Sequence, residues 1–284
     1  MTEFSKTWTW YKGDWHEGNP PLMGPRAHAF WLGSSVFDGA RVFEGVMPDL
    51  DLHCARTNNS ARTMGMNPTM EAGAIVELTK EGADKFDPDI AIYVRPTYWG
   101  VGEGLSVITA DPDDIDFCLT MFEAPMKKSA GMRITTTSFR RPTVECMPVN
   151  AKAGCLYPNN ARCLKEAIAK GFDNAIVCDM LGNVAELATA NVFIVKDGIV
   201  KTPVPNGTFL NGITRQRVIQ LLTAAGIKVV ECTLSIDDCR DADEMFSTGN
   251  YSKVAPIVAF DDREFGAGPM SAKAKELYWE FAHK

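Results

Sequence analysis

The sequence lacks the features that mark several special classes of protein. Its 284 residues are 45% hydrophobic, but they contain no continuous apolar run of about 18 residues, the length that a membrane-spanning helix needs. The eight cysteines include no C-x-x-C pair and do not group with the four histidines, which argues against a zinc site and against a disulfide framework. We therefore expect a globular protein with no membrane partner and no metal, whose cysteines are buried as small apolar residues.

The charge and the start of the sequence exclude two further classes. The formal net charge is -7, and no dense cluster of Lys and Arg is present of the kind that binds a phosphate backbone, so we expect no nucleic-acid partner. The sequence starts with MTEFSKTWTWYKGDW, whereas a secretory signal would start with basic residues followed by an apolar block. We therefore expect a cytoplasmic protein.

One seam divides the chain. The segment APMKKSAGM places Pro, Gly and two lysines between an apolar run, DFCLTMF, and an alternating run, MRITTTSF, which is typical of a short linker. A chain of this length suggests two domains. The sequence therefore predicts an α+β fold with a small N-terminal domain over residues 1–123, a linker over 124–133, and a larger, hairpin-rich domain over 134–284.

The first half mixes strands and helices. VFDGARVFEG, DLDLH at 49–53 and DIAIYVRPTYW have the composition of strands. The spacing of apolar residues predicts helices over 54–65 and 69–85. These elements suit a small domain in which helices pack on a sheet.

The second half alternates helices with hairpins. YPNNARCLKEAIAKG has apolar residues at helical spacing and ends at Gly171, which suits a left-handed helix cap. DNAIVCD with VAELAT, and then ANVFIVKDGIVKTP with a turn at Asp197-Gly198, predict two consecutive hairpins. In LNGITRQRVIQLLTAAG, Thr214 is expected to cap a further helix.

One lysine stands out because small residues surround it. In NAKAGCLYPNN, Lys152 has no acidic neighbour in sequence, and an unpaired lysine is usually a solvated surface group. Small neighbours would, however, leave room for a bulky planar partner, and desolvation would favour the neutral, nucleophilic amine. Tyr157 follows, and Glu186 lies between apolar residues in NVAELATANVF. Pyridoxal 5'-phosphate (PLP) needs an amine for its aldehyde, a carboxylate for its pyridine nitrogen and donors for its phosphate.

Seven motifs then give a family resemblance. They are SSVFDGAR (34–41), HCARTNNSA (53–61), IYVRP (92–96), NAKAGCLY (150–157), VAELATANVFIVKDG (184–198), LNGITR (210–215) and FSTGN (246–250). In this order they resemble the class IV aminotransferases, the fold type IV PLP enzymes, and most closely the branched-chain amino acid aminotransferases. The resemblance covers nearly the whole chain. It implies the two-domain fold of that family, PLP as cofactor, and a homodimer with its active site at the subunit interface.

The resemblance also implies roles for the residues around the ring of the cofactor. Lys152 would be the Schiff-base lysine, which holds the cofactor and later moves the proton between the substrate Cα and C4′ of the cofactor. Glu186 would lie beside the pyridine nitrogen and keep it protonated. Tyr157 would lie near the phenolic oxygen of the cofactor.

Further residues are implied at the phosphate. Arg56 matches the arginine of the family, and a guanidinium can make two charge-assisted bonds to a phosphate. Ile213 and Thr214 would present backbone N–H groups at a helix N-terminus. Thr248 and Gly249 would add contacts from the STGN loop.

The substrate would contact a second set of residues. Tyr93 and Arg95 lie two apart in a strand and so share one face, Phe37 would form an aromatic wall, and Arg41 keeps the arginine of the family after FDGA. The full set implied for the substrate is Phe37, Arg41, Tyr93, Arg95, Thr248, Gly249 and Asn250. The chain departs from the branched-chain pattern at Leu32, Cys155 and Leu156, where that pattern has Tyr, Gly and Asn.

The predicted function is a PLP-dependent aminotransferase. A hydrophobic L-amino acid would donate its amine, and a 2-oxo acid such as 2-oxoglutarate would accept it in a second half-reaction. An (R)-selective amine transaminase or a D-amino acid transaminase of the same fold is the alternative, followed by an aminodeoxychorismate lyase. A non-catalytic cofactor carrier or interaction protein is also possible, but the presence of Lys152, Glu186, Arg56 and Tyr157 together argues against it.

Overall fold

The computed structural model describes residues 4–126 and 130–284, which form two compact units. Unit 1 comprises the described residues up to Met126 together with Ala151–Cys155, and unit 2 comprises the remaining described residues. The predicted larger domain, 134–284, included Ala151–Cys155, whereas in the structure this segment packs with unit 1. Of the predicted linker, residues 127–129 lie outside the described residues.

Unit 1 is built on a six-stranded sheet in which every strand pairing is antiparallel. Two nine-residue strands pair along their whole length at its centre, and helices pack against the sheet. The strands are β1 (Thr7–Tyr11), β2 (Asp14–Glu17), β3 (Ser35–Phe37), β4 (Ala40–Val42), β5 (Ile92–Gly100) and β6 (Ile115–Glu123), and the helices are α1 (His28–Leu32), α2 (Leu50–Thr63) and α3 (Ala72–Ala83).

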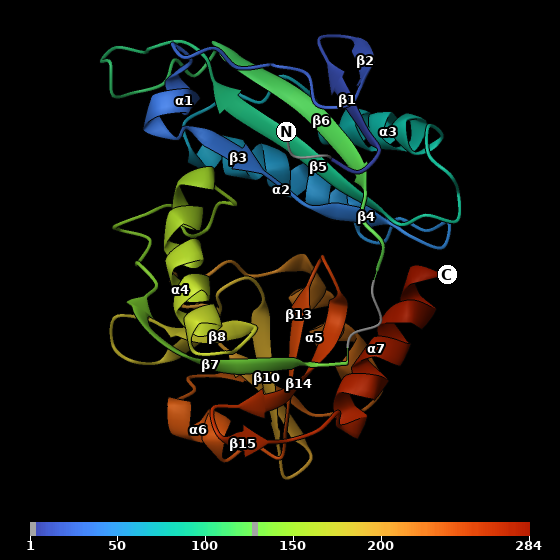
Figure 1. Cartoon of the computed structure of the whole chain (residues 1–284), viewed down its shortest axis with the longest axis vertical. Coiled ribbons are helices and arrows are strands. Elements are labelled where there is room, and N and C mark those ends of the chain that lie inside the picture. Colours follow the sequence, from blue (N-terminus) through green and yellow to red (C-terminus); the bar gives the residue numbers. More distant parts are fainter. Residues whose placement is uncertain (1–3, 127–129) are drawn as a thin grey trace. The chain divides into compact units, whose positions relative to one another are not determined.

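The two faces of this sheet differ. On one face, α2 and α3 pack against β5 and β6 (Figure 1) and bury Val94, Tyr98, Leu119 and Met121. A fully buried side chain of this size contributes about 1.5–3 kcal/mol to stability. Because side chains alternate along a strand, the residues between these point to the opposite face. That opposite face carries several of the residues predicted to bind substrate.

The strand predicted over 49–53 was wrong, because DLDLH forms the start of α2. Asp49 adopts a left-handed conformation (φ 56°), and its carbonyl oxygen accepts a hydrogen bond from the backbone N–H of His53. Leu50, His53 and Cys54 are buried at helical spacing, whereas Leu52 is exposed. Five alternating residues fit the first turns of a helix as well as they fit a strand.

Unit 2 is built on a nine-stranded mixed sheet. Its strand order is β12-β11-β10-β13-β14-β7-β8-β9, and β15 pairs with β14 at the side. The strands are β7 (Met132–Arg140), β8 (Asn174–Cys178), β9 (Val184–Leu187), β10 (Asn191–Lys196), β11 (Ile199–Pro203), β12 (Val229–Cys232), β13 (Glu244–Gly249), β14 (Lys253–Phe260) and β15 (Arg263–Glu264), and the helices are α4 (Tyr157–Ala169), α5 (Ile213–Ala224), α6 (Ile236–Arg240) and α7 (Pro269–Ala282).

Both predicted hairpins are confirmed. The strands β8 and β9 pair antiparallel, as do β10 and β11, whose turn has positive φ at Asp197 (50°) and Gly198 (73°). Separate apolar clusters form in unit 2. The helices α5 and α7 (Figure 1) pack in one with Phe193 and Phe246, and α6 contributes Cys239 to another. Glu186 lies on β9, in the first of these hairpins, and is buried.

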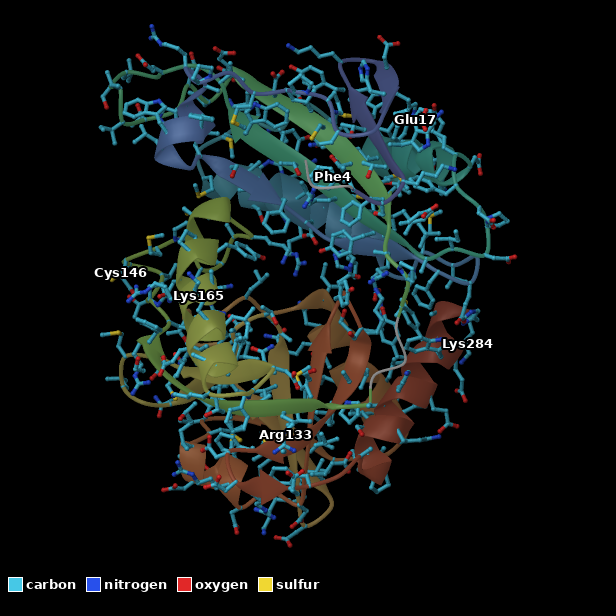
Figure 2. The ribbon with its side chains drawn as sticks, in the orientation of Figure 1. Phe4, Glu17, Arg133, Cys146, Lys165 and Lys284 are labelled. Atoms are coloured by element: carbon cyan, nitrogen blue, oxygen red, sulfur yellow. The ribbon has the colours of Figure 1, made fainter. Side chains whose placement is uncertain are left out.

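One of the eight cysteines, in unit 2, is exposed. Figure 2 labels Lys165 of α4 and Cys146, and Cys146 is exposed. The expectation of buried cysteines is wrong for Cys146, and Cys155 and Cys232 are only partly buried. It is confirmed for Cys54, Cys118, Cys163, Cys178 and Cys239. Within the described residues, every helix is too short or too polar to cross a lipid bilayer.

Candidate active site

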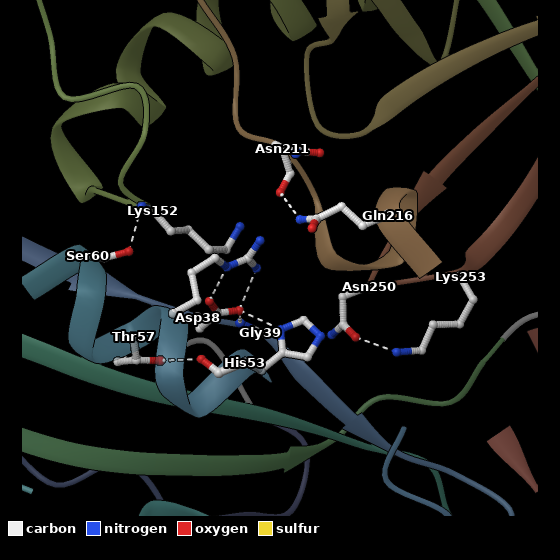
Figure 3. Close-up of polar contacts among 11 residues, drawn as sticks. Asp38, Gly39, His53, Thr57, Ser60, Lys152, Asn211, Gln216, Asn250 and Lys253 are labelled. Carbon is white, nitrogen blue, oxygen red and sulfur yellow. Dashed lines mark hydrogen bonds and ion pairs between the residues drawn. The ribbon is translucent and has the colours of Figure 1, made fainter. Parts of the chain in front are cut away.

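The segment around Lys152 is fixed to unit 1 on both sides. The backbone N–H of Lys152 donates to Oγ of Ser60 on α2 at 3.0 Å (Figure 3). Its carbonyl oxygen accepts a hydrogen bond from the backbone N–H of Phe37 at 3.1 Å. Ala153 forms an isolated bridge with Val36 of β3. These contacts explain why this short segment belongs to unit 1, although the chain on either side of it lies in unit 2.

Small residues around Lys152 allow this close approach. Ala151 and Ala153 are buried, and a Cβ placed on Gly154 would lie 2.5 Å from Oγ of Ser35. The Nζ atom of Lys152 lies 5.0 Å from the centroid of the Phe37 ring. The backbone is therefore held in place, and the side-chain amine lies near the Phe37 ring.

Arg56 is held by a buried carboxylate on the loop that follows β3. Its Nε donates to Oδ2 of Asp38 at 2.6 Å and its Nη2 donates to Oδ1 at 2.8 Å. Nδ1 of His53 lies 2.8 Å from Oδ1 of the same group (Figure 3). Burial alone would raise the pKa of Asp38, but Arg56 and then His53 outweigh it and hold that pKa well below its usual range. The guanidinium that is predicted to bind phosphate is thus oriented by a carboxylate.

Tyr93 and Arg95 project from β5 on the face opposite α2 and α3. The Tyr93 ring stacks on Phe122 of β6 with centroids 5.3 Å apart, and the Arg95 guanidinium lies 5.3 Å from the same ring. A Cβ on Gly39 would lie 2.0 Å from Oη of Tyr93, so only glycine fits there. Arg41 is fully buried and lies over the Tyr93 ring, 5.8 Å from its centroid.

A cavity of about 360 Å³ lies on this same face of unit 1. Leu22 and Met23 form part of its lining, together with Phe37, Trp99 and the guanidinium-bearing Arg95. Polar groups of Thr9, Asn19, Thr97, Cys118 and Thr120 line it as well. The cavity therefore combines a largely apolar wall with one cation, a combination suited to a small apolar acid.

In unit 2, Glu186 is a buried carboxylate with two polar partners. Nη2 of Arg141 lies 2.9 Å from Oε1, and Nδ2 of Asn191 lies 3.3 Å from Oε2. Only 11% of the Glu186 side chain is exposed. A carboxylate in an alternating strand usually faces water, so its burial beside an arginine marks it as a candidate functional group.

Asn191 connects Glu186 with the start of α5. Its Nδ2 also donates to the carbonyl oxygen of Leu210 at 3.1 Å, and it pairs across the sheet with Thr248. A Cβ on Gly212 would lie 2.3 Å from Oδ1 of Asn191. The residue before α5 must therefore be glycine if Asn191 keeps this position.

The prediction that Thr214 caps this helix was wrong. Gly212 is the N-cap of α5, no side chain caps the helix, and Thr214 lies buried inside its first turn. The backbone N–H groups at the start of Ile213–Ala224 are the kind of donors that bind an anion.

The strand β13 adds a hydroxyl donor in unit 2. Oγ1 of Thr248 is buried and has no hydrogen-bond partner among the described residues. The amide of Asn250 accepts a hydrogen bond from Nζ of the buried Lys253 at 2.5 Å (Figure 3), and Gly249 lies between these positions. An uncapped helix N-terminus and an unpartnered buried hydroxyl are suited to a phosphate, so this donor set fits the predicted cofactor.

Tyr157 and the residues that depart from the family pattern lie near segment ends. Tyr157 is the first residue of α4 and is 36% exposed. Leu32 ends α1, and Leu156 ends the 3₁₀ turn η1 (Gly154–Leu156). Burial raises the pKa of Cys155, which argues against a reactive thiolate beside Lys152.

Three polar residues of the candidate site were not predicted from the sequence: Asp38, Arg141 and Asn191. Asp38 could have been noticed, because an acid inside the apolar run VFDGARVF needs a partner if that run is buried. Arg141 and Asn191 gave no such signal, because their partners are remote in sequence or lie in a loop.

The chain is similar to known proteins. The sequence matches the family described as Amino-transferase class IV over residues 35–260. It is 31% identical over 285 residues to a branched-chain-amino-acid aminotransferase of Pseudomonas aeruginosa (95% of this chain, 91% of the relative) and 27% identical over 293 residues to one of Escherichia coli K12 (99% and 94%).

Solved structures are also similar. An aminotransferase from Brucella abortus bound to PLP has a TM-score of 0.97 at 58% identity, covering 98% of this chain and 100% of that chain. A branched-chain aminotransferase from the archaeon Thermoproteus uzoniensis, solved with norvaline, has a TM-score of 0.88 at 27% identity, covering 98% of this chain and 96% of that chain.

Proposed function

The chain belongs to the class IV aminotransferases, which are PLP-dependent, and from this premise we propose its substrates. It transfers the amino group of a hydrophobic L-amino acid, such as a branched-chain amino acid, to a 2-oxo acid such as 2-oxoglutarate in two successive half-reactions. The names of its relatives, which specify branched-chain amino acids, support this choice.

The observation that carries the proposal is the cavity of unit 1. Its apolar wall, with Leu22, Phe37 and Trp99, is suited to a hydrophobic side chain, and Arg95 is suited to a carboxylate. Burying an additional methylene in such a wall favours a substrate by about 1–3 kcal/mol, enough to prefer leucine over alanine.

Lys152 carries the proposed acid-base chemistry. Bound PLP supplies the electron sink that makes the proton on the substrate Cα acidic. Lys152 would hold the cofactor through its ε-amine and, once released, would accept that proton on Nζ and give it up again as the acid. The contacts of its backbone with Ser60 and Phe37 fix the base of the side chain, which limits the positions that Nζ can reach.

The remaining residues bind and orient. Glu186 provides the negative charge for the ring nitrogen, and Tyr157 provides a hydroxyl for the phenolic oxygen. Candidate phosphate ligands occur in each unit: Arg56 in unit 1, and in unit 2 the start of α5 and Thr248. A homodimer remains a prediction, which size-exclusion chromatography with light scattering will check.

A donor panel tests the substrate. L-leucine, L-alanine, D-alanine and 1-phenylethylamine are each supplied with 2-oxoglutarate or pyruvate, and product formation is measured. We expect the highest kcat/KM for L-leucine with 2-oxoglutarate. A higher value for D-alanine or 1-phenylethylamine would instead support a transaminase of the opposite handedness.

A cavity variant tests the binding site itself. Leu22→Trp should fill the cavity and raise KM for L-leucine by about tenfold or more, with a smaller effect for L-alanine. Leu52→Trp, at an exposed position of α2, is the matched control and should leave KM unchanged. Equal effects of the two substitutions would show that the cavity does not bind the substrate.

Chemical trapping tests the lysine. Borohydride reduction of the PLP-loaded protein followed by peptide mapping should place a pyridoxyl group on Lys152. Lys152→Ala should lose the label and the activity, and Lys165→Ala, which removes a lysine of α4, should retain both. A label on any other residue would contradict the assignment.

A further inference from the structure

Arg141, which follows β7, is a buried arginine whose guanidinium contacts several parts of unit 2. Its Nη2 lies 2.9 Å from Oε1 of Glu186 and donates to the carbonyl oxygens of Leu187 and Ala188 at 3.3 and 3.4 Å. Its Nη1 donates to Oδ1 of Asn160 on α4. Only 7% of the Arg141 side chain is exposed, so the ion pair is formed largely out of water.

The two carboxylate oxygens of Glu186 have different neighbours. Oε1 lies 2.9 Å from Nη2 of Arg141, and Oε2 accepts a hydrogen bond from the neutral amide of Asn191 at 3.3 Å. Burial favours the neutral form of a carboxyl group, and a nearby cation favours the ionised form. A guanidinium keeps its charge at every pH of interest. The contact with Arg141 therefore favours the ionised carboxylate and fixes the direction of one oxygen.

The thiols near the ion pair of Arg141 and Glu186 do not compete with Glu186 for the positive charge of Arg141. The backbone N–H of Arg141 donates to the carbonyl oxygen of Cys178 on β8 at 2.9 Å, and Cys163 of α4 also lies in this region. Burial raises the pKa of both thiols, so they stay neutral near pH 7. The charge of Arg141 is thus available to Glu186.

We propose that Arg141 is a positioning residue of the aminotransferase site. Its guanidinium keeps the Glu186 carboxylate ionised and in one orientation, so that Glu186 presents a fixed negative charge to the ring nitrogen of the cofactor. This inference rests on the proposed role of Glu186. Arg141 contacts the Glu186 carboxylate directly, at 2.9 Å, and it is through this contact that it acts.

The shape of the guanidinium explains why an arginine fits this place. Its planar fork reaches the carboxylate and the two carbonyl oxygens with one nitrogen while the other nitrogen contacts Asn160. A lysine would keep the positive charge but would lose part of this set. Arg141→Lys and Arg141→Gln therefore separate the effect of charge from the effect of geometry.

A double-mutant cycle tests the inference in the full-length protein. Arg141→Gln, Glu186→Gln and the double variant are compared by kcat, by KM for the best donor of the panel, and by the Kd for PLP from equilibrium dialysis. We expect Arg141→Gln to lower kcat by about 10- to 100-fold, which lies within the range shown by coupled neighbours, and to weaken PLP binding. In the Glu186→Gln background the same substitution should change kcat by less than about twofold. Arg140→Gln, which removes the exposed neighbouring guanidinium, should match the wild type.

The possible outcomes distinguish the inference from the proposed function. Equal losses of kcat in the two backgrounds, or a wild-type kcat and Kd for Arg141→Gln, would overturn the inference and leave the role of Glu186 intact. A wild-type kcat for Glu186→Gln would overturn that role and the inference with it.

A second variant covers the case in which Arg141→Gln does not fold. Arg141→Lys should keep kcat within about tenfold of the wild type, because the charge remains beside Glu186. A larger loss that is the same in the Glu186→Gln background would overturn the inference.

Discussion

Replacing Asp38 with asparagine removes one charge from the interior of unit 1 with little change in size. The carboxylate accepts hydrogen bonds from Nε and Nη2 of Arg56 at 2.6 and 2.8 Å and from the backbone N–H of Gly39 at 2.6 Å, and Nδ1 of His53 lies 2.8 Å away. An asparagine offers only one acceptor oxygen and no charge. We expect Arg56 to lose its orientation and the folded state to lose stability.

The magnitude follows from the burial of the pair. The side chain of Asp38 is 0% exposed and that of Arg56 is 17% exposed. Removing one partner of a buried ion pair costs about 3–5 kcal/mol, and the partial exposure of Arg56 favours the lower end, about 3 kcal/mol. At about 2–4 °C for each kcal/mol, the Tm should fall by about 6–12 °C.

Thermal unfolding followed by circular dichroism at pH 7 measures this loss in the absence of cofactor. Asp84→Asn, at the C-terminal end of α3, is the matched control and should change stability by less than about 0.5 kcal/mol. If the Tm of Asp38→Asn lies within about 2 °C of this control, Asp38 does not balance the buried cations, and the account of Arg56 is wrong.

The same pair of proteins gives a test by pH. Because Arg56 and His53 outweigh burial, the folded-state pKa of Asp38 lies below its value of about 3.9 in the unfolded chain. The stabilisation is therefore complete above about pH 4 and is lost as the pH falls through the folded-state pKa. The stability difference between wild type and Asp38→Asn should shrink as the pH falls below about 4, and a difference that stays constant there would refute the assignment.

Smaller effects are expected elsewhere. At about pH 8 a thiol reagent should label the exposed Cys146 first. Burial raises the pKa of Cys239 to about 12, so this thiol should react only after unfolding. Equal labelling rates of the two cysteines, measured by peptide mapping, would contradict this. Ser235→Ala removes the capping box of α6 and should lower the free energy of unfolding in urea by about 1 kcal/mol, and an unchanged midpoint would contradict it. Hydrogen bonds, first from Thr137, lower the pKa of Glu166 to about 2, so its stabilising contribution is lost as the pH falls from about 4.5 to 2. In Glu166→Gln the free energy of unfolding should therefore change less with pH over this range, and the same pH dependence as the wild type would contradict this.

The elements predicted well from the sequence are those set by local patterns. The apolar spacing of YPNNARCLKEAIAKG gave α4, and Asp197-Gly198 gave the turn between β10 and β11, because a helix face and a tight turn depend on residues close in sequence. The segment 49–53 failed because its pattern is too short to separate a strand from a helix start. The predicted cap of α5 was wrong because the helix begins at Ile213, one residue before Thr214, with Gly212 as its N-cap.

In the candidate site, some residues could be identified from the sequence and others could not. The amine of Lys152 and the acid of Glu186 could be identified from residue type, sequence neighbours and resemblance, and their roles stay predictions. The groups that hold them could not be found, because Ser60 lies 92 residues from Lys152 and the partners of Arg141 come from two separate segments. Side-chain contacts of this kind follow from the tertiary fold and leave no periodic signal in the sequence.

The attachment of Ala151–Cys155 to unit 1 also affects synthesis on the ribosome. A nascent chain that has emerged only as far as Met126 lacks the residue that bridges to Val36 and the backbone carbonyl that accepts from Phe37. Because domains generally fold as units during synthesis, unit 1 can be completed only after the chain has emerged through Cys155. A gene truncated after β6 would therefore encode a fragment with an unfinished edge, and separate expression of unit 1 requires a design that supplies this segment.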